Sequence, residues 1–153
     1  MHKFRRMLLE NEEKLKSIMD NKLPHYPKVK DFSYDIVETL NDYTMCTSCE
    51  SLLYFPAAKT FEGPAAGSVL VCSDHPCFSD YGFKDGINCV KHKQFDINDF
   101  HKKISYYIKN PNELRKIQKE GTNFVRENYN HSKVAEYVYE QIKEKYESRQ
   151  TEN

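Results

Sequence analysis

One acidic side chain lies in an apolar stretch, where a functional role is expected of it. Glu62 lies within Lys59–Gly67, a short run made mostly of small and apolar residues. An unpaired carboxylate is costly in apolar surroundings, so we expect Glu62 to face a cleft or a partner. The alternative is a solvated glutamate on the surface of a short helix.

Two closely spaced cysteines offer a second kind of chemistry. Cys46-Thr-Ser-Cys49 could be a redox pair or half of a zinc site. The residues that could complete a zinc site are Cys72, His75, Cys77 and His92. Their spacing fits no familiar zinc knuckle, and the pair lies in a predicted strand and its exit, whereas a thioredoxin-like pair opens a helix. Since the chain has five cysteines, an odd number, we expect reduced structural thiols, no bound metal and a cytoplasmic location.

Glu62 is expected on a short helix that leads into a buried strand. The segment from Lys59 to Ala66 ends at Gly67, which suits one or two helical turns with a glycine exit. The segment from Ser68 to Cys72 is a short apolar run rich in β-branched residues, typical of a buried parallel strand. A helix followed by such a strand is half of an α/β unit, so the predicted fold class is α/β.

The rest of the chain supplies two more short strands and five more helices. The strands are predicted at Tyr43–Thr47 and Asn88–Lys91, so the predicted sheet is small, parallel and three-stranded. The first two helices are an amphipathic one over 3–20 and one at Tyr34–Asn41. Three final helices have starts marked by Asp96, Asn110-Pro111 and Ser132.

The predicted organisation is a helix and linker (1–30), a Rossmann-like domain (31–147) and a polar tail (148–153). Segments 48–58 and 73–84 are predicted to be loops.

An ordered series of motifs resembles a known family. Lys59-x-Phe-Glu62-x-x-Ala65-x-Gly67, followed by an apolar strand, is similar to the nucleotide-sugar-binding half of two-domain (GT-B) glycosyltransferases of the family 1/4-like type. The closest resemblance is to the glycosyltransferase-like domain of bacterial spore-maturation proteins. The further matches, in the family's order, are Gly82-Phe-Lys-Asp-Gly-Ile-Asn88, Asp96, Tyr106-Tyr-Ile-x-Asn110-Pro111, Gly121 and His131. The resemblance covers residues 31 to 142.

This resemblance implies a partial Rossmann-like domain that binds a nucleotide-diphosphate sugar, whose glycosyl group passes to an acceptor hydroxyl. It implies that Glu62 accepts hydrogen bonds from the ribose, which suits an ionised carboxylate facing a vicinal diol. The other implied donor-site residues are Lys59, Thr60, Gly82, Asp85 and Asn88. Lys59 and the N–H groups at the start of its helix could face the phosphates. GT-B enzymes generally need no bound metal, so we expect no cofactor. The alternatives are a solvated Lys59 and an ordinary turn at Asp85-Gly86.

The sequence departs from the family pattern in two places. Many GT-B families have a glutamate near the transferred sugar eight positions before Glu62, but this chain has Tyr54 there, and Glu50 is out of register. In the doubly wound order, no upstream segment looks like the strand expected beside Tyr43–Thr47. That edge would be covered by the helix over 3–20, a second subunit or a separate acceptor-domain chain. The alternative to an enzyme is a non-catalytic module that binds a nucleotide sugar or a protein.

The overall charge favours neither nucleic acid nor membrane as a partner. The 153 residues include 23 Lys and Arg and 23 Asp and Glu, so the net charge is zero. The apolar runs are too short to span a bilayer. We expect no signal peptide, because the N-terminal residues have a basic start but no long apolar core. This length suits one domain with a modest core.

Overall fold

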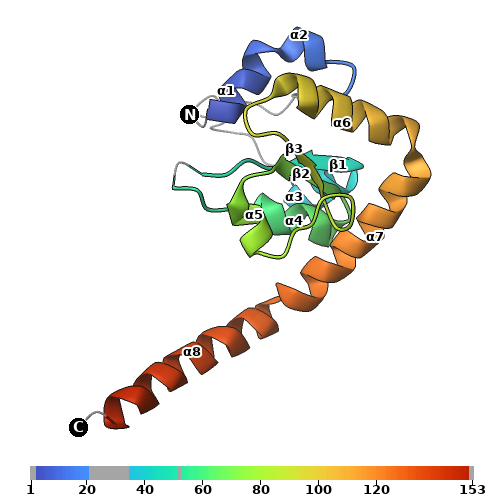
Figure 1. The fold of residues 1–153 in the computed structure, drawn as a ribbon. Helices are drawn as coiled ribbons and strands as arrows, with labels where there is room; N and C mark the ends of the chain where they lie inside the picture. Colours follow the sequence, from blue (N-terminus) through green and yellow to red (C-terminus); the bar gives the residue numbers. More distant parts are fainter. Residues whose placement is uncertain (1–2, 21–34, 52, 152–153) are drawn as a thin grey trace.

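A computed structural model of the protein describes residues 3–20, 35–51 and 53–151. A small sheet lies between two groups of helices (Figure 1). The elements, in chain order, are α1 (Lys3–Glu10), α2 (Glu12–Leu15), α3 (Ile36–Asn41), β1 (Met45–Thr47), α4 (Lys59–Ala66), β2 (Val69–Ser73), α5 (Pro76–Asp80), β3 (Val90–His92), α6 (Ile97–Lys109), α7 (Pro111–Asn128) and α8 (His131–Thr151). The α/β fold class predicted from the sequence is confirmed.

The sheet is parallel, with the strands in the order β1-β2-β3. Met45 of β1 pairs with Val69 of β2, and Val71 of β2 pairs with Val90 of β3. Every residue of the central strand β2 is buried. Consecutive side chains of a strand point to opposite faces, so β2 contributes to two separate cores.

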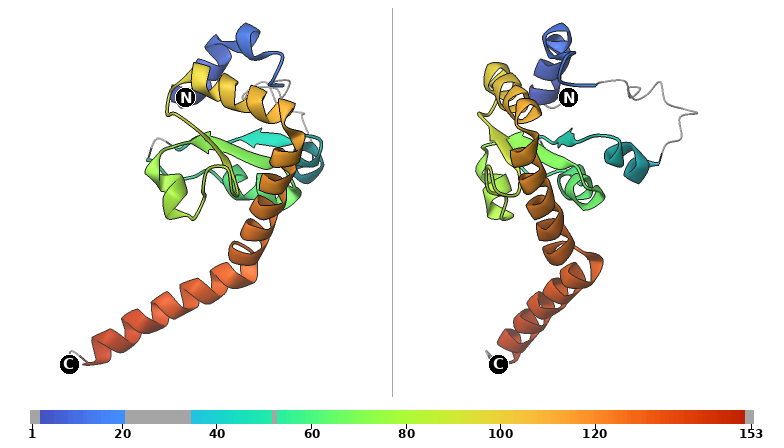
Figure 2. Two further views of the ribbon diagram at one scale, coloured as in Figure 1. Left: turned by 45° about the vertical axis from the view of Figure 1, so that its right-hand side comes forward. Right: turned by 90° about the vertical axis from the view of Figure 1, so that its right-hand side faces the viewer.

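The first core contains Val69, Val71 and Val90 together with residues of α1, α2, α6 and α7. The second contains Leu70, Cys72 and residues of α5 and α7, with Phe61 and Ala65 of α4 packed against it. In Figures 1 and 2, α1, α2 and α6 lie on one side of the sheet and α4 and α5 on the other. The helices therefore sandwich the sheet, as expected for a buried parallel sheet.

The helix predicted to carry Glu62 is confirmed as α4 (Lys59–Ala66). Gly67 follows it in the left-handed conformation, with φ 101°. This conformation costs glycine little, and it lets the N–H groups of Gly67 and Ser68 bond the carbonyls of Pro64 and Gly63. From α7, Arg126 donates both Nε and Nη2 to the carbonyl oxygen of Ala65, at 3.0 and 2.7 Å. The end of α4 and the start of β2 are thus fixed together.

Four local predictions need correction. The amphipathic helix predicted over 3–20 is interrupted at Asn11, whose φ of −112° and ψ of 20° depart from helical values, so that α1 and α2 are separate helices. Within the predicted loop 73–84 lies the short helix α5.

The last helix begins with a cap from Asn130, whose Oδ1 accepts the N–H of Lys133, so Ser132 is not the cap. The predicted polar tail is helical as far as Thr151, because α8 continues without a break. The linker predicted at the end of segment 1–30 lies outside the described residues.

Among the described residues, β1 forms one edge of the sheet. Its Met45 is half-buried and packs against the core that contains Leu15, with Ile18 and Met19 also against that core. The N-terminal segment therefore covers part of the apolar surface beside β1. No helix in the described part of the chain is long and apolar enough to cross a membrane.

His92, at the end of β3, is a buried ring with one unused nitrogen. Its imidazole stacks on Phe4 of α1, with ring centroids 4.6 Å apart, and meets the edge of Phe100 at 5.2 Å. Nδ1 lies 2.9 Å from the carbonyl oxygen of Lys93, to which it donates. Nε2 is buried, and no group in the described part of the chain bonds to it. Burial lowers the pKa of His92 below its ordinary value of 6.5.

We expect the stability of the protein to fall as the pH drops below about 6.5. The unfolded chain binds the proton at His92 more tightly than the folded chain, so acid favours unfolding. Urea denaturation midpoints at about pH 7.5 and 5.5 measure the effect, and His92→Leu should flatten the difference. Glu50 acts in a lower window, because its folded pKa lies below 4.5. An unchanged pH difference in His92→Leu would exclude His92 as the cause.

Candidate functional site

Polar side chains meet where the three parallel strands end, which we call the carboxyl edge of the sheet. Glu50 follows β1, Ser73 ends β2 and Gln94 follows β3. Ser73 Oγ donates to Glu50 Oε2 at 2.9 Å, and Gln94 Nε2 donates to Glu50 Oε1 at 2.6 Å. One carboxylate therefore ties the ends of all three strands together. Ligands of open α/β sheets bind at this edge.

Glu50 is only 6% exposed, yet it is held in the ionised form. Its burial alone would raise the pKa, but the opposing contributions outweigh it and the pKa is lowered. These contributions are hydrogen bonds from Gln94, from the backbone and from Ser73, together with the nearby His75. Both carboxylate oxygens accept hydrogen bonds from protein groups, so Glu50 positions its neighbours.

The loop between β1 and α4 carries an aromatic side chain to this edge. The Tyr54 ring stacks on the imidazole of His75, with centroids 4.8 Å apart and planes 7° from parallel. Tyr54 has a φ of 60°, an unusual conformation for a bulky residue. The His75 ring in turn caps α5, because the N–H of Cys77 donates to its Nδ1 at 3.2 Å.

The first turn of α4 lies at the same edge. Thr60 is buried, and its hydroxyl is 2.8 Å from the hydroxyl of Ser48, the residue directly after β1. This bond holds the start of α4 against the end of β1. Three N–H groups of that turn, those of Thr60, Phe61 and Glu62, already bond the carbonyls of Ala57 and Ala58. These three groups are therefore not available to a phosphate, contrary to the expectation from the sequence.

Lys59 and Glu62 differ from Thr60 in being open to solvent. Glu62 is exposed on α4, and Lys59 is half-buried. Burial lowers the pKa of Lys59, and the positive charge of Arg5 on α1 lowers it further. Neither Lys59 nor Arg5 makes an ion pair with a described residue. Two cations without an acidic partner among the described residues thus influence each other here, an arrangement that an anion would stabilise.

The other three candidate residues lie at the opposite edge. Gly82, Asp85 and Asn88 precede β3, so they lie where the parallel strands begin. Asn88 is buried; its Oδ1 accepts the N–H of Lys84 at 2.7 Å, and its Nδ2 donates to the carbonyl of Gly82 at 3.1 Å. The structure therefore places Lys59, Thr60 and Glu62 at the start of α4, whereas the other three candidates belong to the segment that leads into β3. That segment contacts α4 through the ring of Phe61, which packs against Tyr81 and Phe83.

Asp85 supports β3 and α6. Its Oδ1 accepts the N–H of Lys91 at 2.7 Å, and its Oδ2 pairs with Lys103 at 2.9 Å. The contacts of this turn thus shape the start of β3.

The five cysteines are all free thiols. Cys46 lies against Gly63 of α4 with no room for a further atom between them. Burial raises the pKa of Cys46 to about 11, and burial also raises the pKa of Cys49. Raised pKa values are typical of unreactive structural thiols. No cluster of three or more potential metal ligands occurs within the described ranges.

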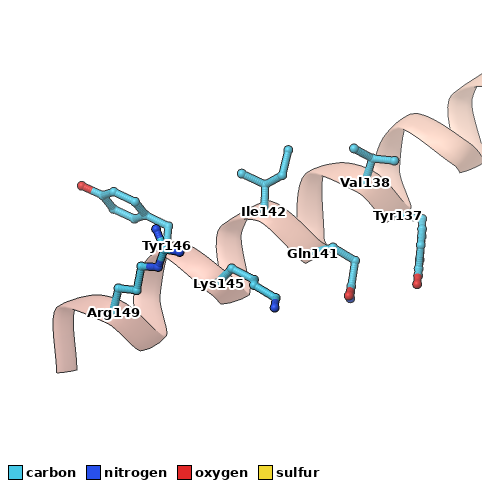
Figure 3. A pocket seen from close by; sticks show the side chains of 7 residues that line it. All are labelled: Tyr137, Val138, Gln141, Ile142, Lys145, Tyr146 and Arg149. Atoms are coloured by element: carbon cyan, nitrogen blue, oxygen red, sulfur yellow. The ribbon is translucent and has the colours of Figure 1, made fainter. Parts of the chain in front are cut away.

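Two surface hollows lie away from the carboxyl edge. One is lined by side chains of α8 alone, which alternate between two sides of the helix (Figure 3): Tyr137, Val138, Gln141, Ile142, Lys145, Tyr146 and Arg149. The other is mainly apolar and lies at the start of β1, between Ile18, Tyr43 and Tyr107. Neither hollow brings acidic and cationic side chains together, so neither suggests a catalytic site.

A protein-family model described as glycosyl transferase-like matches residues 6–140. The chain belongs to this family. The match begins within α1 and ends within α8, so it spans both edges of the sheet. A search of curated proteins gave no match.

Solved structures share the glycosyl transferase-like fold. HepE from Anabaena, in complex with UDP and glucose, has a TM-score of 0.68 and 10% identity, with 92% of this chain and 37% of HepE covered. A complex of HepE with UDP-glucose gives 0.64 and 8% over the same shares. Sucrose-phosphate synthase from Thermosynechococcus elongatus gives 0.53 and 15%, covering 62% of this chain and 24% of that one. The fold is that of GT-B glycosyltransferases, and the chain spans 37% or less of the length of these proteins.

The sequence did not predict that four residues would meet at the carboxyl edge: Glu50, Ser73, His75 and Gln94. A usable signal was present, because each ends or closely follows a predicted strand. The rule that ligands bind at the ends of parallel strands would have drawn attention to all four.

Proposed function

We propose that this protein acts in glycosyl transfer, binding a nucleoside-diphosphate sugar at the carboxyl edge of the sheet. One observation carries the proposal. Lys59 and Glu62 lie in the first turn of α4, and the Ser48–Thr60 hydrogen bond holds that turn against the end of β1. A cation and an accessible carboxylate are thus placed where α/β domains bind nucleotides.

The two side chains suit different parts of the donor. Glu62 accepts hydrogen bonds from the two ribose hydroxyls, since an ionised carboxylate can bond both members of a vicinal diol. Lys59, assisted by Arg5, faces the diphosphate. Neither cation is neutralised by a described acidic residue. The arrangement therefore leaves positive charge available to the donor.

The same charges would assist the reaction. In glycosyl transfer the bond between the anomeric carbon and the diphosphate breaks, and an acceptor oxygen bonds to that carbon while losing its proton. Negative charge grows on the leaving diphosphate, where Lys59 and Arg5 stabilise it. We assign the acceptor and the base that takes its proton to a further domain, another chain or a second copy.

Calorimetry with UDP, the nucleotide in the HepE complexes, tests the proposal directly. ADP and GDP extend the test to other bases. We expect one of these nucleotides to bind and to raise the thermal midpoint in a concentration-dependent way. The absence of binding by all three at millimolar concentration would overturn the proposal. Binding of both donor and acceptor without transfer would favour the alternative, a non-catalytic nucleotide-sugar module.

A further inference from the structure

The last helix, α8, extends away from the rest of the molecule (Figures 1 and 2). Every side chain from His131 to Arg149 is exposed. Neither core includes a residue from the described part of α8. Isolated helices are only marginally stable in water, and most helices in proteins are stabilised by the packing of an apolar face. Packing against a partner would therefore add stability to α8.

One row of residues along α8 is apolar, and we call it the α8 stripe. It consists of Val134, Val138, Ile142 and Tyr146, which are 44%, 48%, 65% and 65% exposed. Figure 3 shows Val138, Ile142 and Tyr146 on the same side of the helix. Residues four positions apart form the ridges that interdigitate in the commonest class of helix pairs. The α8 stripe is thus suited to packing against another helix.

The charges of α8 favour a protein partner over a membrane surface. On the side opposite the stripe, three glutamates four positions apart are exposed: Glu136, Glu140 and Glu144. Over the whole helix, glutamates are as numerous as lysines and arginines together. Helices that lie on membranes usually have an excess of Lys and Arg on their polar face. The balanced charge of α8 instead suits a contact with another balanced helix.

The two flanks of the α8 stripe have the same pattern. One flank contains Tyr137, Gln141 and Lys145, and the other contains Ala135, Tyr139 and Lys143. In each flank the tyrosine is nearer the N-terminus and the lysine nearer the C-terminus. The midpoint between tyrosine and lysine is position 141 in both flanks, and the midpoint of the stripe is within one residue of it.

This pattern is complementary to itself when two copies run in opposite directions. With Gln141 of one copy opposite Gln141 of the other, Lys145 would lie beside the second copy's Tyr137, and Lys143 beside its Tyr139. A lysine over a tyrosine ring is a favourable cation–π contact. In a parallel pair the lysines of the two copies would meet and repel each other. Charge complementarity therefore favours a second copy in the antiparallel direction.

We infer that two copies of this protein associate through the α8 stripe, with the two helices antiparallel and centred near Gln141. Ile142 becomes buried at the centre of the contact, while the glutamates on the opposite side stay in water. The inference goes beyond the proposed function, because no residue of the carboxyl edge takes part. One helix pair buries less surface than a standard interface, so we expect a dissociation constant of roughly 1–100 µM.

Sedimentation equilibrium measures the association. We expect the wild type to change from monomer to dimer between about 1 and 500 µM. Ile142→Glu places a charge at the centre of the stripe and should raise the dissociation constant by at least about 10-fold. Glu140→Gln, on the opposite side of α8, is the matched control and should dimerise like the wild type. Since Ile142 is exposed in the single chain, Ile142→Glu should keep the thermal midpoint of the monomeric wild type.

Single cysteines determine the direction of the two helices. Gln141→Cys should form a disulfide between copies on treatment with oxidised glutathione, because this position faces itself. Val134→Cys should not, since its two copies would lie about 20 Å apart along an antiparallel pair. The wild type under the same treatment is the control for the five native cysteines.

The remaining outcomes would overturn the inference. Cross-linking of Val134→Cys, or none of Gln141→Cys, would exclude the antiparallel arrangement. A dimer that Ile142→Glu leaves intact would place the interface elsewhere. A monomer at every concentration would exclude a second copy and leave the α8 stripe to a different protein or to a membrane.

Discussion

Replacing Glu62 with alanine is expected to weaken nucleoside-diphosphate binding by about 1.5–3 kcal/mol, roughly 10- to 150-fold. An ionised carboxylate that bonds both ribose hydroxyls contributes on this scale. The side chain of Glu62 is exposed on α4, and its carboxylate makes no hydrogen bond or ion pair with a described residue. Its removal should therefore change the free energy of unfolding by less than about 0.5 kcal/mol.

A ligand lacking one hydroxyl makes the test specific. The wild type should bind UDP more tightly than 2′-deoxy-UDP, and Glu62→Ala should largely abolish that preference. Glu120→Ala, which removes an exposed carboxylate from α7, is the matched control and should bind both ligands like the wild type. If UDP binds but Glu62→Ala keeps the full preference, the ribose is recognised elsewhere.

The sequence predicted best those elements whose signals are local. The helix Lys59–Ala66 was predicted with its observed bounds, because Gly67 marks a left-handed exit and the apolar strand follows at once. Asp96 was predicted as a cap and does accept the N–H groups of Asn98 and Asp99. In both places a few neighbouring residues determine the backbone conformation.

Elements that depend on tertiary contacts were harder to predict. The helix α5 has only five residues and is capped by a histidine ring, which is an uncommon cap. The place of Glu50 after a predicted strand suggests a site, but its ionised state cannot be predicted locally, because Ser73 and Gln94, which bond its carboxylate, come from distant parts of the chain. The carboxyl-edge site arises only when the three strands are side by side.

The donor-site residues taken from the family resemblance show a second limit of predicting a site from the sequence. Motif order alone placed Glu62 and the turn Gly82–Asn88 in one set, but it did not say on which edge of the sheet each lies. The turn precedes β3, whereas α4 begins beside the end of β1. The direction of the strands decides at which edge of the sheet each segment lies. A parallel sheet predicted from the sequence was therefore enough to separate Glu62 from the turn Gly82–Asn88.

Gly121→Ala is expected to destabilise the protein by about 1–3 kcal/mol, although helix propensity alone predicts a gain of about 1 kcal/mol. Gly121 is buried in α7, and a Cβ added there would lie 2.6 Å from the backbone carbonyl oxygen of Asn88. Asn88 cannot move away easily, since it holds the backbone of both Gly82 and Lys84. The close approach of α7 to this turn therefore requires glycine.

Urea or thermal unfolding of three proteins decides between packing and propensity. Asn123→Ala introduces the same residue into the same helix at an exposed position, so it should leave stability unchanged or raise it slightly. Gly121→Ala should lower the thermal midpoint by roughly 2–4 °C for each kcal/mol lost. If both variants were equally stable, α7 would not pack against Asn88 as closely as the structure places it. A loss confined to Gly121→Ala would show that the turn before β3 is held by direct backbone contact with α7, independently of any ligand at the carboxyl edge.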